Sequence, residues 1–341
     1  MGSTARRAPR LAEVAKLAQV STGLVSRVVN DDPTLRVRAE TRQRVLDAVK
    51  MLNYTPDMSA RALRNAHTGM LGFALHHAND PIYMQLVDEA QTRASERNYS
   101  LFLLNTAELA DRGDAFRAIV LGRRVDGLLI QLGVDADESP LREVARAVPS
   151  IVFGADRADD LRTIRLDDVA AARMATQHLI DAGHTAIAYL GGGGSSSRRR
   201  YDGYCAALAD AGLPAQAPTE AGWMPDTAHD ATVRLLRAQH GITGIVAVTT
   251  TTALGVHSGI VAAGYTIPDD ISLVSVHDTW FAGHLNPPLT AVALPLPDVG
   301  RLAVDLLIKQ IDAPSPGEVV VDVPAPRLIV RGSTGAPRAA R

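Results

Sequence analysis

The segment from Ser21 to Arg27 gathers, within seven residues, groups that can hydrogen-bond to a polyanion. The hydroxyls of Ser21, Thr22 and Ser26 can bond to phosphate oxygens or base edges, and the Arg27 guanidinium can make a bidentate contact with guanine. Gly23 contributes no side chain. If this segment opens a helix, its N-terminal positions present this chemistry to the major groove of DNA.

Hydrophobic spacing predicts the elements that would position these groups. Apolar residues recur at helical intervals over residues 11–18, Ser21 is a suitable N-cap for a second helix, and residues 41–52 form a third. Helix, tight turn and helix in this order predict a helix-turn-helix. Taken alone, the pattern also fits a small three-helix bundle that caps another domain and carries solvated arginines.

The charge of the chain is unevenly distributed. Residues 1–67 contain twelve Lys and Arg against six Asp and Glu, a net charge of +6, whereas the whole chain has a net charge of -2, so the remainder is -8. A basic head on an acidic body is expected when the head alone meets a polyanion.

Beyond residue 69, short apolar runs alternate with amphipathic segments. The runs predict seven strands, over 71–75, 100–105, 126–132, 150–153, 186–190, 244–249 and 272–277. The segments predict helices over 84–97, 168–182, 201–211, 227–239, 254–263 and 299–311. Alternation of this kind predicts parallel sheets that hold ligands at the carboxyl ends of their strands, and seven strands fit two lobes better than one sheet.

Several function classes are disfavoured. The sequence shows neither a transmembrane run nor a signal peptide, and Cys205 is its only cysteine, so we expect a cytoplasmic protein with no membrane partner. Residues 191–197 (GGGGSSS) lack the GK[ST] ending of a P-loop, and neither an HExxH pair nor a GxSxG turn is present. We therefore expect no enzymatic activity, no cofactor and no metal.

The head closely resembles the DNA-binding headpiece of the lactose-repressor (LacI) family. The resemblance covers residues 11–30 (LAEVAKLAQVSTGLVSRVVN) and 40–64 (ETRQRVLDAVKMLNYTPDMSARALR). It implies a headpiece over 1–53, and a hinge helix and linker over 54–68 that orders on DNA. Arg10 stands where the family usually has a Thr or Ser that caps the first helix, and Gln19 stands where it usually has a turn glycine. Loss of the cap costs about 1 kcal/mol, which the fold can tolerate.

The resemblance also implies which residues contact DNA. Leu63 matches the leucine that wedges into the minor groove at the operator centre, a step that unstacks bases and bends the duplex. An ordinary linker helix, with Leu63 in a small packing contact, is the alternative. The full predicted DNA-binding set is Ser21, Thr22, Gly23, Ser26, Arg27, Asn30, Tyr54, Arg61, Leu63 and Arg64.

Residues 69–334 resemble the effector-binding and dimerisation domain of the same family, which is similar to periplasmic sugar-binding proteins. Landmarks include residues 123–130 (RRVDGLLI), 178–192 (HLIDAGHTAIAYLGG) and 265–278 (YTIPDDISLVSVHD). The resemblance implies an N-lobe over about 69–166 and 296–324, a C-lobe over about 167–293 and 325–334, and a tail over 335–341 that we expect to be disordered.

Carried over by position, the effector cleft is expected to be lined by Asp80, Tyr83, Asp167, Arg200, Trp223, Thr249 and His277. Arg200 would bind ligand oxygens and Trp223 would stack on the ligand. The alternative for Arg200 is a solvated arginine in a run of three, and the alternative for Trp223 is a residue that packs in the core or between the lobes. Thr249-Thr250 and His277 stand where sugar-binding relatives carry Asn-Asp and an aspartate, which favours an acidic, phosphorylated or less polar ligand.

The sequence therefore predicts an all-α helix-turn-helix head joined to an α/β periplasmic-binding-protein-like body of two parallel-sheet lobes. The expected function is a ligand-responsive transcriptional repressor. It would bind a pseudo-palindromic double-stranded DNA operator as a homodimer, be nucleoid-associated when bound, and take a small-molecule effector in the cleft. A tetramer stays open, although the tail lacks heptads. A transporter's solute-binding protein is the alternative, but it would need a signal peptide and no basic head.

Overall fold

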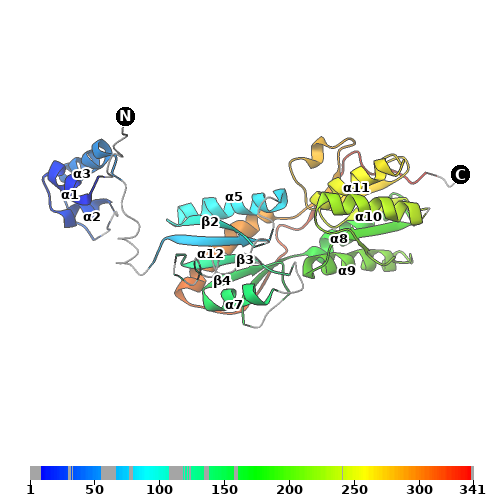
Figure 1. Ribbon diagram of the computed structural model, residues 1–341, viewed down its shortest axis with the longest axis horizontal. Helices are drawn as coiled ribbons and strands as arrows, with labels where there is room; N and C mark the ends of the chain where they lie inside the picture. The colour runs from blue at the N-terminus through cyan, green and yellow to red at the C-terminus, as the bar shows by residue number, and fades with distance from the viewer. Residues whose placement is uncertain are drawn as a thin grey trace, which may run out of the picture. The chain divides into compact units, whose positions relative to one another are not determined.

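The computed structural model describes residues 9–29, 32, 34–54, 67–76, 80–106, 118, 120, 122, 124–133, 138–156, 160–239 and 241–338. The chain divides into two compact units, Met1–Thr68 and Gly69–Arg341. Each unit is described by itself, and Figure 1 gives the labels of the elements.

The first unit is a three-helix domain, with α1 over Leu11–Ala18, α2 over Thr22–Val29 and α3 over Ala39–Leu52. Its core contains Val14, Val25 and Val45, one fully buried valine from each helix. The first helix forms despite both departures from the family pattern. Arg10 provides no side-chain cap. Gln19 adopts the left-handed backbone conformation, with φ of 55°, that a glycine would adopt more easily.

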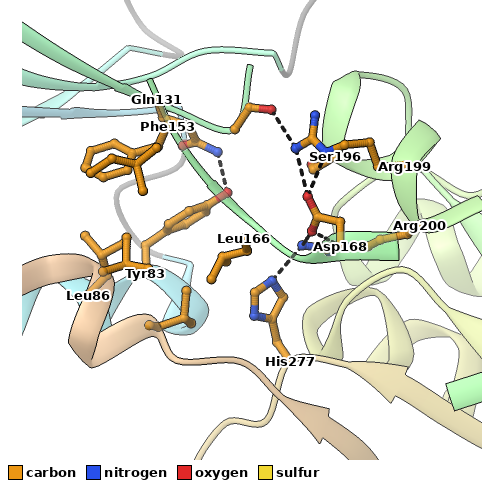
Figure 2. A pocket seen from close by; sticks show the side chains of 14 residues that line it. Tyr83, Leu86, Gln131, Phe153, Leu166, Asp168, Ser196, Arg199, Arg200 and His277 are labelled. Atoms are coloured by element: carbon orange, nitrogen blue, oxygen red, sulfur yellow. Dashed lines mark hydrogen bonds and ion pairs between the residues drawn. The ribbon is translucent and has the colours of Figure 1, made fainter. Parts of the chain in front are cut away.

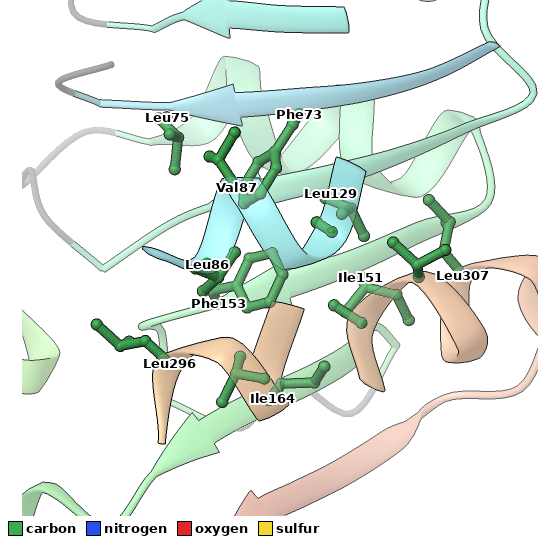
Figure 3. Close-up of a cluster of buried hydrophobic side chains, with 14 of the residues drawn as sticks. Phe73, Leu75, Leu86, Val87, Leu129, Ile151, Phe153, Ile164, Leu296 and Leu307 are labelled. Atoms are coloured by element: carbon green, nitrogen blue, oxygen red, sulfur yellow. The ribbon is translucent and has the colours of Figure 1, made fainter. Parts of the chain in front are cut away.

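The second unit contains two six-stranded sheets. The first has the order β11-β5-β4-β3-β1-β2 with every pairing parallel. Its strands are β1 Met70–Leu75, β2 Ser100–Asn105, β3 Gly127–Gln131, β4 Ser150–Phe153, β5 Arg162–Leu166 and β11 Gly317–Val321. Its helices are α5 Pro81–Glu96, α7 Ser139–Ala147 and α12 Leu296–Asp312. Helices α5 and α12 pack on one face (Figure 3), and α7 packs on the other.

The second sheet has the order β12-β10-β9-β8-β6-β7, and only its β10–β12 pairing is antiparallel among the described strands. Its strands are β6 Ile187–Gly191, β7 Thr219–Glu220, β8 Gly244–Ala247, β9 Ser272–Val276, β10 Thr290–Ala293 and β12 Arg327–Ile329. Helices α8 Asp168–Asp181 and α9 Ser195–Asp210 cover one face, and α10 Pro225–Ala238 and α11 Thr250–Ala262 cover the other. A short 3-10 helix, η1, spans Ala282–His284.

The chain crosses between the two sheets three times, after β5, after β10 and after β11. We call the part built on the first sheet the N-lobe and the part built on the second the C-lobe. The predicted fold class, a helix-turn-helix region with an α/β body of two mainly parallel sheets, is confirmed. No helix in the described ranges has the length and apolar character needed to cross a membrane.

Some predicted elements were wrong in number or extent. The described residues form twelve strands rather than seven, because β5 (RTIRL) carries two arginines and the edge strand β7 has only two residues. Helix α9 begins at Ser195, six residues before the prediction, since its polar first turns face a charged cluster rather than an apolar core.

The predicted disorder of the tail is also wrong for residues 335–338. The backbone of Gly335 accepts a hydrogen bond from His184 Nε2 at 2.9 Å and donates one to Ser272 Oγ at 3.0 Å. Arg338 pairs with Asp270 at 3.2 Å. These contacts order the segment on the C-lobe.

Candidate functional sites

The N-terminal half of α2 exposes the groups expected to read DNA. Ser21, Thr22, Gly23 and Arg27 are all exposed. The backbone N–H of Leu24 donates to Ser21 Oγ at 3.2 Å, so Ser21 caps the helix as its sequence position predicts. This face can therefore present hydroxyls and a guanidinium to a groove.

Arg27 is held by the loop that follows α2. Its Nε donates to Asp32 Oδ2 at 2.7 Å and its Nη2 donates to Thr34 Oγ1 at 3.0 Å. Hydrogen bonds from Thr34 and Arg27 lower the pKa of Asp32 to about 2, so this carboxylate is ionised at neutral pH. These bonds use two of the five guanidinium N–H groups, so Arg27 can contact a base with the others or by exchanging these partners.

Two other residues expected to contact DNA lie closer to the core of the head. Ser26 is buried with Val25 and Val28, and Tyr54 is partly buried against the same core. Their side chains offer less surface to DNA than those of Thr22 and Arg27. The expected contacts at Asn30, Arg61, Leu63 and Arg64 lie outside the described residues.

A cavity of about 60 Å³ lies between the N-lobe and the C-lobe, where strands of both sheets end (Figure 2). Its apolar lining comes from Leu86, Phe153, Ile164, Leu166, Leu296 and Val299. Its polar lining comes from Tyr83, Gln131, Asp168, Ser196, Arg199, Arg200 and His277. Gly154 completes the lining. Since small-molecule sites usually measure at least about 300 Å³, a ligand must be small or must displace part of this lining.

A buried carboxylate organises the polar side. Asp168 contacts four guanidinium nitrogens: Arg199 Nε and Nη2 at 3.1 and 2.8 Å, and Arg200 Nε and Nη2 at 2.9 and 2.8 Å. All three side chains are less than a tenth exposed. The remaining groups of Arg200 reach the Val248 carbonyl at 2.7 Å and His277. The alternative of a solvated arginine at position 200 is therefore excluded.

The geometry at His277 fixes its proton. Nε2 of His277 lies 2.8 Å from Arg200 Nη2, and a guanidinium only donates, so Nε2 accepts and the neutral ring carries its hydrogen on Nδ1. Burial, and next the charge of Arg200, hold the pKa of His277 well below its usual value. Its Nδ1 is buried and has no hydrogen-bond partner among the described residues.

The backbone at His277 is also unusual. Its φ of 65° lies in the left-handed region, which few non-glycine residues adopt. The hydroxyl of Thr250 donates to the His277 carbonyl oxygen and holds this turn after β9. The strained turn directs the imidazole into the cleft between the arginines and the apolar wall of Leu86 and Leu166 (Figure 2).

Tyr83 supplies a second group with an unused hydrogen. Gln131 Oε1 accepts from the His76 backbone N–H at 3.0 Å, which turns the amide so that its Nε2 donates to the Tyr83 hydroxyl oxygen. Burial raises the pKa of Tyr83, and the charge of Asp80 adds to the effect. The hydroxyl therefore stays protonated and can donate its hydrogen to a ligand.

Direct contacts join the lobes on both sides of the cavity. Thr251 Oγ1 donates to Asp80 Oδ1 at 2.9 Å, and Gln85 Nε2 donates to the Asp278 carbonyl at 2.7 Å. On the other side the Ser195 backbone N–H donates to the Gly133 carbonyl at 2.9 Å. The protein's own groups thus connect the lobes on both sides of the cavity.

Comparison with known proteins agrees with this architecture. Residues 10–57 match the model of the bacterial regulatory proteins of the lacI family, and residues 176–334 match the periplasmic binding protein-like domain. The ribose operon repressor of Escherichia coli (strain K12) is 33% identical over 333 residues, which cover 94% of this chain and 98% of the repressor. The chain belongs to the LacI family.

Other members of the LacI family match over the same length. The transcriptional repressor PurR of Mannheimia succiniciproducens is 29% identical over 94% of this chain and 97% of its own. A crystal structure of the Lac repressor dimer bound to operator and the anti-inducer ONPF gives a TM-score of 0.81 at 26% identity, covering 97% of this chain and 100% of that one. The resemblance found in the sequence is thereby confirmed.

The structure brings together only part of the effector set carried over from the LacI family. Tyr83, Arg200 and His277 line the cavity. Asp80, Asp167 and Thr249 instead cap α5, α8 and α11, accepting from the backbone N–H groups of Ile82, Ala170 and Thr252. Trp223 lies against Gly192, where an added Cβ would be 2.7 Å from its Nε1.

Sequence reasoning missed several groups of the cavity. Asp168 is the next residue after the expected Asp167, and Arg199 precedes the expected Arg200. Position alone did not show that Asp168 turns inward in place of Asp167, or that both arginines do. The sequence does carry a signal for Asp168: an acid at the first position of a helix is free to face inward when the residue before it supplies the cap. Gln131 is the last residue of the fully buried strand β3, and no feature of the sequence indicated that it lines the cavity.

Proposed function

We propose that this protein is a ligand-responsive repressor that binds a pseudo-palindromic operator as a homodimer, with its effector in the cleft between the lobes. The observation that carries the proposal is the match over nearly the whole chain to the Lac repressor dimer bound to operator. Both required parts are present in this chain: an exposed α2 face and a buried polar cavity.

Base recognition is assigned to Thr22 and Arg27, with Ser21 as both helix cap and phosphate contact. Asn30, Tyr54, Arg61 and Arg64 are proposed to position the head and hinge on the phosphate backbone. Leu63 is proposed to wedge into the minor groove, where the bend lets both heads of a dimer contact one site.

Exposed apolar residues support self-association. Strand β2 forms an edge of the first sheet and exposes Phe102 and Leu103 by 43% and 42%. On the C-lobe, Val261 and Trp280 are 57% and 76% exposed. Exposed apolar side chains, especially on an edge strand, favour contact with a partner, and a second copy of this chain is the partner that the Lac repressor dimer suggests.

Effector control is proposed to act through the contacts between the lobes. A ligand that enters the cavity must change the Arg200–His277 contact or the pairs that join Asp80 to Thr251 and Gln85 to Asp278. Because binding then depends on lobe arrangement, the ligand favours one arrangement and shifts the spacing of the hinges. Relatives are named for ribose, and one solved relative holds cellobiose; the altered anchors here favour an acidic effector.

Operator binding can be tested with DNA selected by the purified full-length chain from a random duplex pool. Fluorescence anisotropy of the selected duplex should show an affinity that falls steeply between 50 and 200 mM salt, by about 10³-fold if six phosphates are contacted. Arg27→Ala should lose about 1–3 kcal/mol of discrimination between bases, whereas Arg173→Ala, an exposed arginine of α8, serves as control. Binding that shows no sequence preference and no salt dependence would contradict the proposal.

A further inference from the structure

The net charge of the buried polar lining is positive. Asp168, Arg199 and Arg200 are all buried and together carry one excess positive charge. Arg199 also pairs at 2.8 Å with Asp156, a half-exposed carboxylate that is shared with the exposed Arg198, so the five groups together still carry one excess positive charge. An excess charge that lies mainly in the buried part of such a cluster is costly unless a ligand of opposite charge compensates it. The lining therefore favours an anion with a single negative charge over a neutral sugar or a dianionic phosphate.

The hydrogen-bonding groups of the cavity also favour an anionic ligand. A carboxylate has about four lone-pair positions, and Asp168 already contacts four guanidinium nitrogens. Gln131 Oε1 is occupied by the His76 N–H. Two buried groups have a hydrogen to spare, Tyr83 O–H and His277 Nδ1–H, and the second has no partner among the described residues. The partly buried Ser196 hydroxyl adds a group that can both donate and accept.

A polyol is a poor match for this arrangement. Each sugar hydroxyl donates a hydrogen as well as accepting one, and the strongest acceptors of the cavity are already used. A carboxylate only accepts, so it can take the hydrogens of Tyr83 and His277 without leaving a donor of its own unpaired.

The opposite wall of the cavity is apolar. Six side chains from strands and helices of the N-lobe sheet form it: Leu86, Phe153, Ile164, Leu166, Leu296 and Val299. Contact with this wall removes apolar surface from water only if the ligand carries a hydrocarbon body. The cavity volume of about 60 Å³ requires that body to be small.

From these features we propose that the effector is a small monocarboxylic acid with an aromatic or branched aliphatic body, whose carboxylate accepts from His277 Nδ1–H and Tyr83 O–H. The inference rests on the proposed function, in which this cavity is the effector site. It assigns His277 the role of a specificity-determining residue, since an aspartate in its place would offer an acceptor and a negative charge.

The test is calorimetric titration of the full-length protein with matched pairs: benzoate against benzamide, isovalerate against isovaleramide, and glucose and glucose 6-phosphate as the competing classes. We expect at least one acid to bind about tenfold more tightly than its amide and than either sugar, since a charge-assisted hydrogen bond is worth that much. If neither acid exceeds its amide, or if a sugar binds more tightly than both acids, the inference is wrong.

Variants at His277 assign the effect to this side chain. His277→Asp should weaken the preferred acid about tenfold or more, because two carboxylates then face each other. His277→Gln should retain most of the affinity, since its amide can accept from Arg200 and still donate. His229→Asp makes the same substitution at a histidine of α10 that contacts Ser258 and should change nothing. Equal loss in both His277 variants, with folding intact by circular dichroism, would contradict the assignment.

Operator binding separates this inference from the proposed function. If the protein binds its selected duplex but no acid is preferred, the ligand class is wrong and the repressor function stands. If an acid binds as expected but no duplex is selected, the cavity chemistry stands and the proposed function fails.

Discussion

The α2 face and the cleft both offer arginine to a ligand, but in opposite states. Arg27 is 48% exposed and its partner Asp32 is 28% exposed, whereas Arg200 and Asp168 are 5% and 3% exposed. An exposed pair exchanges partners at little cost, but a buried one cannot be broken without stranding a charge. The head can therefore adapt to DNA, whereas the cleft is organised before any ligand arrives.

The contrast between exposed and buried arginine pairs can be tested through stability, and the largest effect is expected from Asp168→Asn. The substitution removes the charge that compensates two buried guanidinium groups, so the free energy of unfolding of the body should fall by about 3–5 kcal/mol. Asp210→Asn, which breaks the exposed pair with Arg173 on the same two helices, should cost less than about 1 kcal/mol. Urea denaturation followed by circular dichroism measures both, and similar losses would show that burial does not separate the two kinds of pair.

A second substitution should change only the affinity for DNA. If the hinge wedge is correct, Leu63→Ala should weaken binding to the selected duplex by about tenfold, which is 1.4 kcal/mol, because the minor-groove contact that offsets base unstacking is lost. Affinity for the effector should stay within error of the parent, since the cavity is built from residues 83–299. Anisotropy and calorimetry on the same preparations make the comparison, and unchanged operator affinity would remove the wedge.

The same contrast explains what could be predicted from the sequence. Strands buried on both faces, such as β3, β6 and β9, were found because they read as continuous apolar runs. The α2 face was found because its chemistry is local to seven residues. The cleft was found only in part, because pairing of Asp168 with Arg199 and Arg200 joins residues 31 and 32 positions apart. Local patterns could not distinguish the capping Asp167 from the buried Asp168.

The response to pH should also differ between the two regions. Burial lowers the pKa values of His277, His184 and His178, whereas the head has no histidine before His67. Below pH 6.5 the unfolded chain binds protons that the folded body does not, so the free energy of unfolding should fall from pH 7.5 to 5.5. The loss is at most about 1.4 kcal/mol per histidine and pH unit.

Urea titrations at the two pH values measure this loss. His277→Gln should show a smaller loss than the parent protein, because one of the depressed groups is absent. His229→Asp again serves as the control, since no comparable burial holds that ring. Equal losses in the parent and in His277→Gln would mean that His277 does not carry the neutral, buried ring on which the cleft chemistry depends.

The smallest effect concerns glycines that occupy helices of the two regions. At Gly23 an added Cβ would meet nothing nearer than Ser21 Oγ at 3.9 Å, whereas at Gly203 it would lie 2.2 Å from the Val169 carbonyl, where α8 and α9 touch. Gly23→Ala should therefore raise the stability of the head by up to about 1 kcal/mol through helix propensity. It should also shift the selected operator toward thymine at the facing position, since a methyl group can contact the thymine methyl. Gly203→Ala should only destabilise. Thermal unfolding and a second round of duplex selection measure the two outcomes, and an unchanged operator preference for Gly23→Ala would show that this position does not face a base.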